Sequence, residues 1–241
     1  MRRVLVTGGN GQLGEAIRRA AEGSVHSYTF ATIDELDICN GADVEHYIAE
    51  NKIDTIINCA AYTNVEGAES DEAGAMLVNA EGVAILAEAC QRHDIQLIHI
   101  STDYVFGGDG MRKTPYREDD ATAPLNIYGK SKAMGEDMAL GNSGIVIRTA
   151  WLYSPWCKNF VRTILRIAKE KTQIEVVDDQ RGTPTSAISL ARAITTIIDS
   201  GEYVDMKGIY HYTDKGEATW CDFATEIVAQ AGITTCKGVS C

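Results

Sequence analysis

The chain has 241 residues, of which 45% are apolar and 23% are charged, as in ordinary globular proteins and unlike disordered chains. It carries 22 basic and 34 acidic side chains, which give a formal net charge of −12. Because a surface of that sign repels phosphate backbones, we expect no nucleic-acid partner. No apolar run approaches the length of about eighteen residues that spans a bilayer, so we expect no membrane partner either.

Cysteine usage and the N-terminal residues favour a cytoplasmic location. The seven cysteines include no C-x-x-C pair, which favours free thiols in a reducing compartment over a disulfide or zinc framework. Residues 1–6 enter a strand at once, without the apolar stretch of a secretory signal. The five histidines show no metal-ligand spacing, so no metal site is expected, and His99 in the apolar run 97–100 is expected to be a core residue.

Strands and helices alternate over the first 150 residues. In chain order we expect a strand at 3–7, a helix at 12–22, a strand at 28–31, a helix at 43–51, a strand at 55–59, a helix at 73–93, a strand at 96–100, a helix at 126–141 and a strand at 144–148. The strands are short and almost wholly apolar, as in parallel sheets that are buried on both faces. This pattern predicts an α/β fold with a Rossmann-like doubly wound parallel sheet.

Beyond Thr149 the alternation is less regular. Helices are expected at 158–171, 189–199 and 219–231, strands at 174–177 and 208–212, and a loop at 178–186. We therefore predict a dinucleotide-binding domain over 1–150 and a smaller C-terminal lobe over 151–241, which is mainly substrate-binding and returns some segments to the first domain. The polar loop 107–124 is long enough to be functional or mobile.

A glycine-rich turn joins the first strand to the first helix. Gly8, Gly11 and Gly14 stand in the sequence TGGNGQLG at 7–14. Such a turn needs residues without a Cβ so that the chain can bend, a pyrophosphate can approach the backbone and the helix can pack on the strand. The helix N-terminus then presents free N–H groups to the phosphates. The motif predicts a dinucleotide site, although glycines alone would also suit a purely structural turn.

The glycine spacing G-x-x-G-x-x-G resembles that of the short-chain dehydrogenase/reductase superfamily. The stretch 58–61 resembles the N-x-A-A segment that lines the cofactor there, and Asp37 and Ile38 resemble the pair that reads the adenine edge in extended members. A helix cap or a turn explains Asp37 equally well. Asp34 disfavours a 2′-phosphate whereas the arginines at 18–19 favour one, so the choice between NADH and NADPH stays open.

A tyrosine and a lysine stand four residues apart in the helix expected at 126–141. Tyr128 and Lys132 then share one face about 6 Å apart, so that an ammonium would lower the pKa of the phenol. Such a phenol can donate a proton to a carbonyl oxygen as hydride reaches its carbon. Ser101 and Thr102 end the fourth strand, at the sheet edge where ligands bind, and a Thr102 hydroxyl can hold both the phenol and the substrate carbonyl. The alternatives are an exposed aromatic, a solvated lysine and a strand-end turn.

Seven motifs spread over almost the whole chain resemble the dTDP-4-dehydrorhamnose reductase family: GGNGQLG at 8–14, NCAAYT at 58–63, STDYVFG at 101–107, PYRED at 115–119, PLNIYGKSK at 124–132, RTAWLY at 148–153 and GTPT at 182–185. The resemblance implies reduction of the C4 ketone of dTDP-4-dehydro-L-rhamnose to dTDP-L-rhamnose by NADPH or NADH, in the biosynthesis of surface polysaccharide. The partner that it implies is a small sugar nucleotide.

The same resemblance assigns roles to single residues. It implies that Tyr128 is the proton donor, that Lys132 lowers the pKa of Tyr128 and holds the nicotinamide ribose, and that Thr102 is the hydroxyl residue of a catalytic triad. Implied substrate contacts are Thr102, Asp103 and Trp151. Implied cofactor contacts are Gly8, Gly11, Gln12, Leu13, Gly14, Asp37, Ile38, Ala60, Ala61, Tyr62, Thr63, Ser101, Tyr128 and Lys132.

Two other functions stay open. A non-catalytic NADP-binding regulatory subunit of the methionine adenosyltransferase type resembles the same fold, although Trp151 and Thr102 favour the enzyme. A sister reductase would act on another 4-keto-6-deoxy sugar nucleotide or on the other face of the ketone. The choice between monomer and homodimer is open as well. The family continues for several tens of residues beyond a segment like 231–233, so we expect a C-terminal lobe that is shortened relative to the family.

Overall fold

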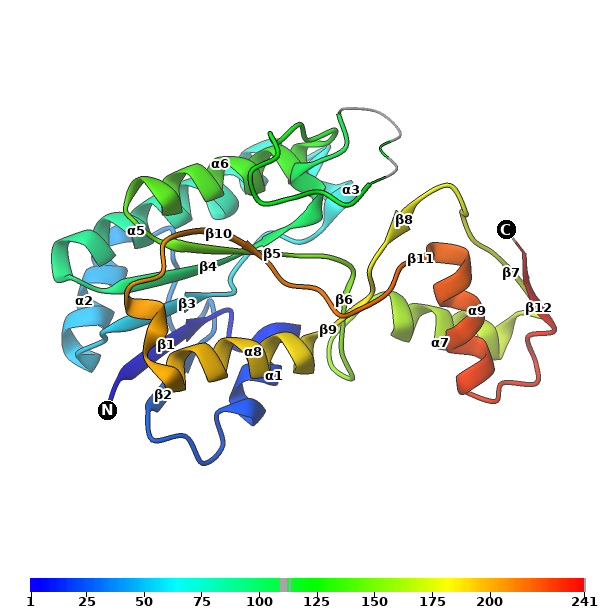
Figure 1. Ribbon diagram of the computed structural model, residues 1–241, viewed down its shortest axis with the longest axis horizontal. Coiled ribbons are helices and arrows are strands. Elements are labelled where there is room, and N and C mark those ends of the chain that lie inside the picture. Colours follow the sequence, from blue (N-terminus) through cyan, green and yellow to red (C-terminus); the bar gives the residue numbers. More distant parts are fainter. Residues whose placement is uncertain (109–111, 113, 241) are drawn as a thin grey trace.

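A six-stranded sheet forms the centre of the fold in the computed structural model, which describes residues 1–108, 112 and 114–240. The strand order is β10-β5-β4-β3-β1-β2, and neighbouring strands are parallel (Figure 1). The strands are β1 Arg3–Thr7, β2 Ser27–Ala31, β3 Thr55–Asn58, β4 Gln96–Thr102, β5 Ile145–Thr149 and β10 Gly208–His211. The predicted parallel α/β sheet is confirmed, and the strand predicted at 208–212 lies at its edge.

Helices cover both faces of this sheet (Figure 1). One face carries α2 Gly41–Asn51, α5 Gly82–His93 and α6 Ile127–Gly141, and the other carries α1 Gln12–Ala20 and α8 Ala187–Ser200. Because successive strand side chains point to opposite faces, Leu5 packs with the first group of helices while Val4 and Val6 pack with the second. Each face therefore has its own apolar layer, which is the doubly wound arrangement that the sequence predicts.

The helix predicted at 73–93 contains a π-helical turn. α4 (Glu72–Met76) leads through η1 (Leu77–Glu81) into α5. This turn packs against α6 so closely that a Cβ on Gly135 would lie 2.1 Å from the Asn79 carbonyl oxygen. By length and composition alone Glu72–His93 could cross a membrane, but half of its apolar window is buried and α5 contributes to the apolar layer on the sheet. The segment is a core helix.

A second group of elements lies beside the C-terminal ends of the strands (Figure 1). α7 (Phe160–Glu170) and α9 (Trp220–Gln230) pack around Ile164, Ala168 and Ala224. Three two-stranded sheets accompany these helices in the described part of the chain. They pair β6 Leu152–Tyr153 with β9 Thr185–Ser186, β7 Gln173–Glu175 with β12 Gly238–Ser240, and β8 Arg181–Gly182 with β11 Ala218–Thr219. The predicted loop at 178–186 thus contains two short strands, because two residues carry no readable periodicity. We call this group the outer lobe.

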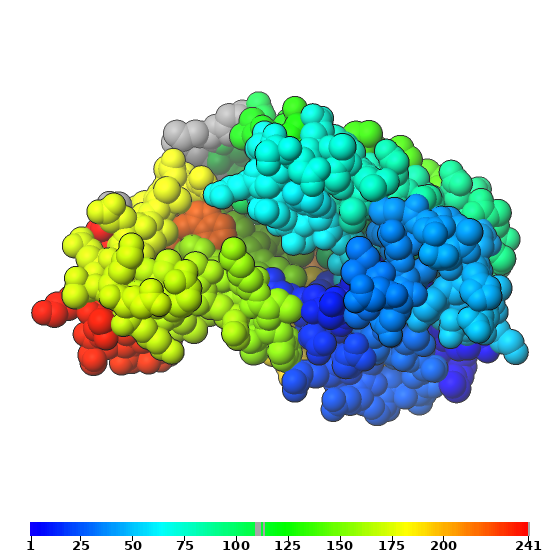
Figure 2. Space-filling model, turned by 180° about the vertical axis from the view of Figure 1, so that it is seen from behind, coloured from blue at the N-terminus to red at the C-terminus, as the bar shows by residue number. Residues whose placement is uncertain are grey.

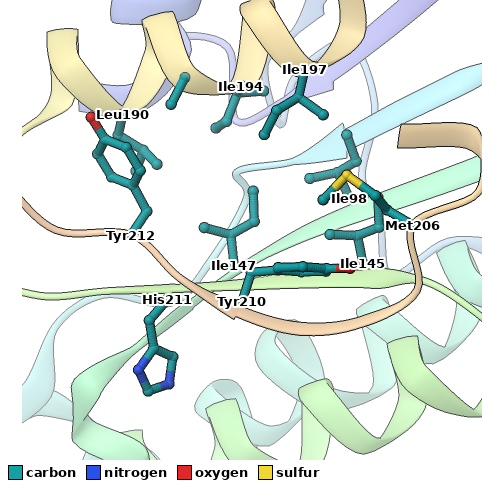
Figure 3. Close-up of a pocket in the computed structure, with 11 residues that line it drawn as sticks. Ile98, Ile145, Ile147, Leu190, Ile194, Ile197, Met206, Tyr210, His211 and Tyr212 are labelled. Carbon is teal, nitrogen blue, oxygen red and sulfur yellow. The ribbon is translucent and has the colours of Figure 1, made fainter. Parts of the chain in front are cut away.

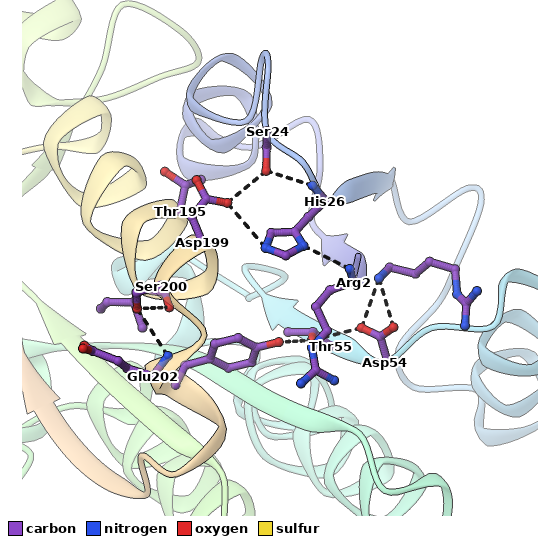
Figure 4. A network of polar contacts seen from close by, with 12 residues as sticks. Arg2, Ser24, His26, Asp54, Thr55, Thr195, Asp199, Ser200 and Glu202 are labelled. Atoms are coloured by element: carbon purple, nitrogen blue, oxygen red, sulfur yellow. Dashed lines mark hydrogen bonds and ion pairs between the residues drawn. The ribbon is translucent and has the colours of Figure 1, made fainter.

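Three short helical segments complete the described elements: α3 Val65–Ala68, η2 Asp103–Val105 and η3 Glu202–Val204. The last of these lies at the end of the sheet where the strands begin. Polar contacts there join α8 and η3 to residues at or just before the starts of the strands (Figure 4). The Ser24 hydroxyl, before β2, donates to Asp199 Oδ1 of α8 (2.9 Å). The Thr55 hydroxyl, at the start of β3, lies 2.8 Å from the Tyr203 hydroxyl. These contacts lie at the end of the sheet opposite to the glycine-rich turn.

The loop predicted at 107–124 is anchored on the sheet where the structure describes it. Phe106 stacks on Tyr116 with ring centroids 4.1 Å apart, and Glu118 Oε1 accepts a hydrogen bond from the His211 N–H of β10 (3.1 Å). Residues 109–111 and 113 of this loop lie outside the described residues.

The state of the cysteines departs from the prediction at one position. Five of them are free thiols, as expected: Cys39, Cys59, Cys90, Cys157 and Cys236. Cys221 is disulfide-bonded. The prediction was wrong there because an odd number of cysteines and the absence of a C-x-x-C pair do not exclude a single bridge.

Candidate active site

The glycine-rich turn follows β1, and its glycines serve different purposes. Gly8 has a φ of +63°, and a Cβ on it would lie 2.8 Å from the Ala60 nitrogen. A Cβ on Gly14 would lie 2.6 Å from the Gly8 carbonyl oxygen, so these two glycines permit the turn itself. A Cβ on Gly11 would meet only that same oxygen, at 3.1 Å. Gly11 therefore leaves space beside the first turn of α1, which has no side-chain cap.

This turn lies where the strand order reverses. β1 has β2 on one side and β3 on the other, so the crossover connections diverge between β1 and β3. In open α/β sheets this switch point is where a crevice for ligands is expected. The predicted segment 58–63 follows β3 on the other side of that switch point. The Ala60 N–H donates to Thr7 Oγ1 across it (3.3 Å). The turn and the segment predicted to line a cofactor are thus adjacent.

Asn79, which the sequence analysis did not single out, holds this segment in place. Its side chain accepts a hydrogen bond from the Tyr62 N–H (2.9 Å) and donates to the Tyr62 carbonyl oxygen (3.0 Å). It also donates to the Ser131 hydroxyl of α6 (3.0 Å). A polar residue inside the apolar stripe of the predicted helix was the available signal, and the π-helical turn that carries it is a frequent feature of functional sites.

Asp37 and Ile38 have partners within the protein. Asp37 Oδ1 accepts a hydrogen bond from the Cys39 N–H (2.9 Å), which is a turn contact. Ile38 is buried under α5, where a Cβ on Gly82 would lie 3.0 Å from its side chain. The turn alternative weighed for Asp37 is therefore realised, and a cofactor contact by either residue stays a prediction.

Two further residues of the glycine-rich turn differ in their surroundings. Leu13 is buried in the apolar layer between α1 and the sheet. Gln12 Oε1 accepts hydrogen bonds from the Ser154 hydroxyl and from Asn159 Nδ2, both at 2.9 Å. Since Asn159 caps α7, Gln12 ties the turn to the outer lobe.

Tyr128 and Thr102, predicted to act together, are brought together by α6 and the end of β4. Asn126 caps α6 by accepting a hydrogen bond from the Gly129 N–H (2.7 Å), which sets Tyr128 in the first turn. Burial raises the pKa of the Tyr128 phenol, and a hydrogen bond with the Thr102 side chain lowers it in part. The phenol is therefore protonated at neutral pH, which is the form that a proton donor needs.

Lys132 lies one turn further along α6, and β4 holds its amine. Nζ donates to the Ile100 carbonyl oxygen (2.7 Å) and lies 3.3 Å from His99 Nε2. Burial lowers the pKa of Lys132 to about 8, against the opposing effect of the Glu136 carboxylate. The prediction that Lys132 lowers the pKa of Tyr128 needs correction, because burial of the phenol dominates and raises it.

Ser101, predicted as a cofactor contact, belongs to a buried ion pair. Its hydroxyl donates a short hydrogen bond to Glu136 Oε1, and Arg148 Nη2 of β5 donates to Glu136 Oε2 (2.6 Å). The side chains of Arg148 and Glu136 are only 4% and 3% exposed. Because Glu136 stands four residues after Lys132 on the same helix face, this pair clamps that face of α6 onto β4 and β5. The i, i+4, i+8 spacing from Tyr128 was a readable signal for Glu136 that the sequence analysis did not use.

Asp103 joins the same cluster from η2. Its Oδ1 accepts a hydrogen bond from the Thr102 hydroxyl (3.1 Å). Burial raises the pKa of Asp103 to about 6, although hydrogen bonds from Thr102 and the backbone act in the opposite direction. The Tyr104 ring meets the Tyr128 ring edge-on, with centroids 5.4 Å apart. A carboxyl group, a hydroxyl and a phenol therefore converge beyond the end of β4.

Trp151 begins the connection from β5 to the outer lobe. Its φ of +48° is rare for a bulky residue. The indole stacks on Trp220 of α9, and a Cβ on Gly182 would lie 2.4 Å from the indole. Trp151 thus packs between two elements of the outer lobe. One face of the molecule is hollowed between that lobe and the N-terminal segments (Figure 2).

A separate apolar cavity of about 170 Å³ lies between α8 and the β5–β10 edge of the sheet (Figure 3). Ile147, Leu190 and Met206 contribute to its lining. The ring of His211 points away from these side chains, and its Nε2 lies 3.5 Å from Arg148 Nη1.

Among the residues that the structure describes, no group of three or more His, Cys, Asp or Glu side chains could hold a metal. The side chains of Tyr128, Thr102 and Asp103 gather beyond the end of β4 and do not line this cavity.

Comparison with known proteins agrees with this arrangement. The sequence model of the family described as RmlD substrate binding domain matches residues 1–240. The dTDP-4-dehydrorhamnose reductase of Burkholderia thailandensis is 40% identical over 235 residues, which cover 94% of this chain and 78% of that protein. A dTDP-4-keto-6-deoxy-D-glucose reductase of Streptomyces niveus is 39% identical over 225 residues, which cover 92% of this chain and 76% of that protein.

A solved structure shares the fold. That of the dTDP-4-dehydrorhamnose reductase of Bacillus anthracis, in complex with NADP, matches with a TM-score of 0.92 and 37% identity, over 100% of this chain and 84% of that one. The resemblance seen in the seven sequence motifs is thereby confirmed. The chain belongs to the family of the dTDP-4-dehydrorhamnose reductases.

Proposed function

We propose that this protein reduces the C4 ketone of dTDP-4-dehydro-L-rhamnose to dTDP-L-rhamnose with NADPH or NADH. The observation that carries the proposal is the convergence of Tyr128, Thr102 and Asp103 beyond the C-terminal end of β4, at the same end of the sheet as the glycine-rich turn. The names of the relatives, which are reductases of dTDP-linked keto sugars, support the choice of substrate. The NADP in the B. anthracis relative supports the choice of cofactor.

The glycine-rich turn fits a dinucleotide. The missing Cβ of Gly11 leaves room for a pyrophosphate, and the uncapped first turn of α1 offers N–H groups to its charge. We assign cofactor contacts to this turn, to 60–63 and to Asp37, and assign the nicotinamide ribose to Lys132. When bound, the reduced nicotinamide supplies the hydride.

The side chains beyond the end of β4 supply the proton. Tyr128 carries it on the phenolic oxygen, and the C4 oxygen of the sugar receives it as the C4–H bond forms. Thr102 hydrogen-bonds the phenol, and its single hydroxyl proton turns to the ketone oxygen when the sugar is bound. Because the Thr102 hydroxyl also donates to Asp103, its direction depends on whether Asp103 is ionised.

The substrate approaches from the outer lobe in this proposal. Residues 1–150 serve as the dinucleotide-binding domain and 151–241 mainly as the substrate-binding lobe, while α8 and β10 complete the sheet. Asp103 and Trp151 contact the sugar nucleotide. The hollow between the lobe and the N-terminal segments offers it a path (Figure 2).

The test is direct turnover. The protein is mixed with NADPH or NADH and with dTDP-4-dehydro-L-rhamnose, and the absorbance of the reduced nicotinamide is followed while NMR identifies the product. Formation of dTDP-L-rhamnose supports the proposal. Dinucleotide binding without turnover would favour the regulatory-subunit alternative. Comparing kcat/KM for the two dinucleotides decides the cofactor preference.

A sister reductase is the second candidate, favoured by the 39% identity to a dTDP-4-keto-6-deoxy-D-glucose reductase. Offering that keto sugar in the same assay, and determining the configuration at C4 of the product, separates the two.

The mostly free cysteines support a cytoplasmic location. Light scattering of the purified protein decides between monomer and homodimer.

A further inference from the structure

A row of polar side chains crosses the sheet from β1 to β4. Thr7 and Asn58 are register partners, and so are Asn58 and His99. The Thr7 hydroxyl donates to Asn58 Oδ1 (2.6 Å), and Asn58 Nδ2 lies 3.1 Å from His99 Nδ1. His99 Nε2 then lies 3.3 Å from Lys132 Nζ. The row therefore leads from the glycine-rich turn to the lysine of the candidate active site.

This row is buried in an otherwise apolar layer. Thr7 is 1% exposed, Asn58 and His99 are 0% exposed, and Lys132 is 2% exposed. The strand residues on the same face are apolar, for example Leu97 of β4. Since buried polar groups are costly unless their hydrogen bonds are satisfied, a fully connected row of this kind calls for a reason beyond packing.

Hydrogen-bond chemistry restricts how the row can be protonated. An ammonium has only donors, so His99 Nε2 must accept from Lys132 when the lysine is charged. The single proton of the neutral ring is then on Nδ1, and Asn58 must offer its oxygen to it. When the lysine is neutral, its lone pair can accept from Nε2–H, and Asn58 offers its amide protons to Nδ1 instead. In the structure Asn58 Nδ2 faces His99 Nδ1, which is the amide orientation that the second arrangement requires.

We propose that His99 is a positioning residue for Lys132, and that the His99 tautomer changes together with the protonation of the lysine. The ring keeps one proton in both states, and the Asn58 amide and the Thr7 hydroxyl, which can donate or accept, adjust to it. The row thus holds the amine in place against the Ile100 carbonyl oxygen in either state. The proposal rests on the proposed function only in taking Lys132 as part of the site.

Other ionisable groups also act on this lysine. Glu136, from the same helix, and Cys59, after β3, both raise the pKa of Lys132, while burial lowers it. Tyr128 stands one turn before it on α6. Burial and the charge of Lys132 lower the pKa of His99, so the ring stays neutral at the pH at which the lysine titrates. The titration of Lys132 is therefore the event to which the ring responds.

The first test is NMR on the full chain labelled with ¹⁵N-histidine, without cofactor or substrate. The two neutral tautomers differ in the shifts of Nδ1 and Nε2, and the His99→Gln spectrum assigns the signals. We expect the Nδ1–H tautomer to give way to the Nε2–H tautomer with a midpoint near the lysine pKa of about 8. In Lys132→Met we expect a single, pH-independent tautomer. One unchanging tautomer in the parent between about pH 6 and pH 10, or a charged ring at the lower pH, would overturn the proposal.

The second test uses matched variants. His99→Leu removes the acceptor for the ammonium, so we expect weaker dinucleotide binding, a shifted pH profile of kcat and a loss of turnover of up to about a hundredfold, as for other small misplacements. His99→Gln keeps a polar atom near the position of Nε2 and should restore much of both. Thr55→Val is the control, since it removes a buried hydroxyl contact to Tyr203 at the far end of the sheet. Its pH profile should match that of the parent.

The outcomes separate this proposal from the proposed function. If His99→Leu and Thr55→Val lower the melting temperature alike and neither moves the dinucleotide Kd or the pH profile, His99 is only a core residue. If the tautomer change is present but no dTDP-sugar is reduced by the parent, the row stands and the proposed function fails.

Discussion

The indole of Trp151 lies face to face with that of Trp220, with ring centroids 3.5 Å apart and planes within 9° of parallel. Trp151 follows β5 and Trp220 begins α9, so this contact joins the sheet to the outer lobe beside the proposed substrate path. Phe160 of α7 packs on Trp220 from the lobe, with ring centroids 4.6 Å apart. Sequence alone pointed to Trp151 but not to its partner.

Replacing Trp151 with alanine should impair use of the sugar nucleotide and leave the dinucleotide Kd nearly unchanged. We expect a lower kcat/KM for the sugar, because one wall of its path is removed. Trp156→Phe, outside the stacked pair, is the matched control. Near-UV circular dichroism should show the coupled band of two stacked indoles in the parent and in the control, but not in Trp151→Ala. A drop in melting temperature with unchanged kinetic constants would mean that Trp151 only packs.

Replacing Tyr128 with phenylalanine should abolish most turnover while the dinucleotide still binds. The proton donor is lost, and such catalysis is typically worth about a hundredfold to ten-thousandfold. Steady-state kinetics and fluorescence titration with NADPH check the two halves of this expectation. A rate within about twofold of the parent would remove Tyr128 from the mechanism.

The glycines at 11 and 14 should fail in different ways. A Cβ in Gly11→Ala meets only the Gly8 carbonyl oxygen, at 3.1 Å, so a small shift of the turn accommodates it. The melting temperature should then fall less than in Gly14→Ala, while dinucleotide binding weakens. A loss of about 1.4 kcal/mol already raises the Kd tenfold. Gly14→Ala forces a Cβ to 2.6 Å from the Gly8 carbonyl oxygen, so it should lower the melting temperature as well. Undiminished NADH and NADPH binding by Gly11→Ala would show that the glycine serves the turn alone.

Breaking the buried pair of Glu136 and Arg148 should be strongly destabilising. Glu136→Leu leaves the guanidinium buried without its partner, at an expected cost of about 3–5 kcal/mol. The double variant Glu136→Leu/Arg148→Met should cost less than the sum of the single changes, because it leaves no unpaired charge. Urea denaturation of all four proteins gives the coupling energy. Additive costs would contradict a direct pair.

Ionising Asp103 should weaken the fold. Its pKa is raised from 3.8 in the unfolded chain to about 6 by burial, so between these values the folded state binds more protons than the unfolded state. Stability from this group is therefore full below the lower value and is lost as the pH rises through the higher one. Asp103→Asn should gain in melting temperature relative to the parent as the pH goes from 4 to 7. A constant difference between the two proteins would contradict the raised pKa.

Much of the fold could be predicted because its signals are local. The strands β1, β3 and β5 are short apolar runs, and the turn at 7–14 carries its own glycine pattern. Tyr128 and Lys132 could be read from helical spacing alone. The pairing of β10 with β5 could not, because four residues of a strand do not say which sheet they join.

The partners of the site residues were harder to predict. Ser101 looked like a cofactor contact because it ends a strand at the ligand edge, yet its nearest acceptor is a carboxylate on a helix that begins later in the chain. The pKa of Tyr128 was predicted in the wrong direction because desolvation depends on tertiary packing, which spacing does not encode. Asn79 depends on a π-helical turn that has no distinct sequence pattern.

The late return of the chain to the sheet has a consequence for folding. α8 and β10 cover the α1 face and the β5 edge, but both are made after the first elements of the outer lobe. A nascent chain that ends at β5 would leave that strand unpaired on one side and the apolar side chains of its α8 face open to water, the state in which strands associate wrongly. The nucleotide-binding half should therefore acquire its full stability only once β10 has been synthesised, after α7 and the first strands of the outer lobe.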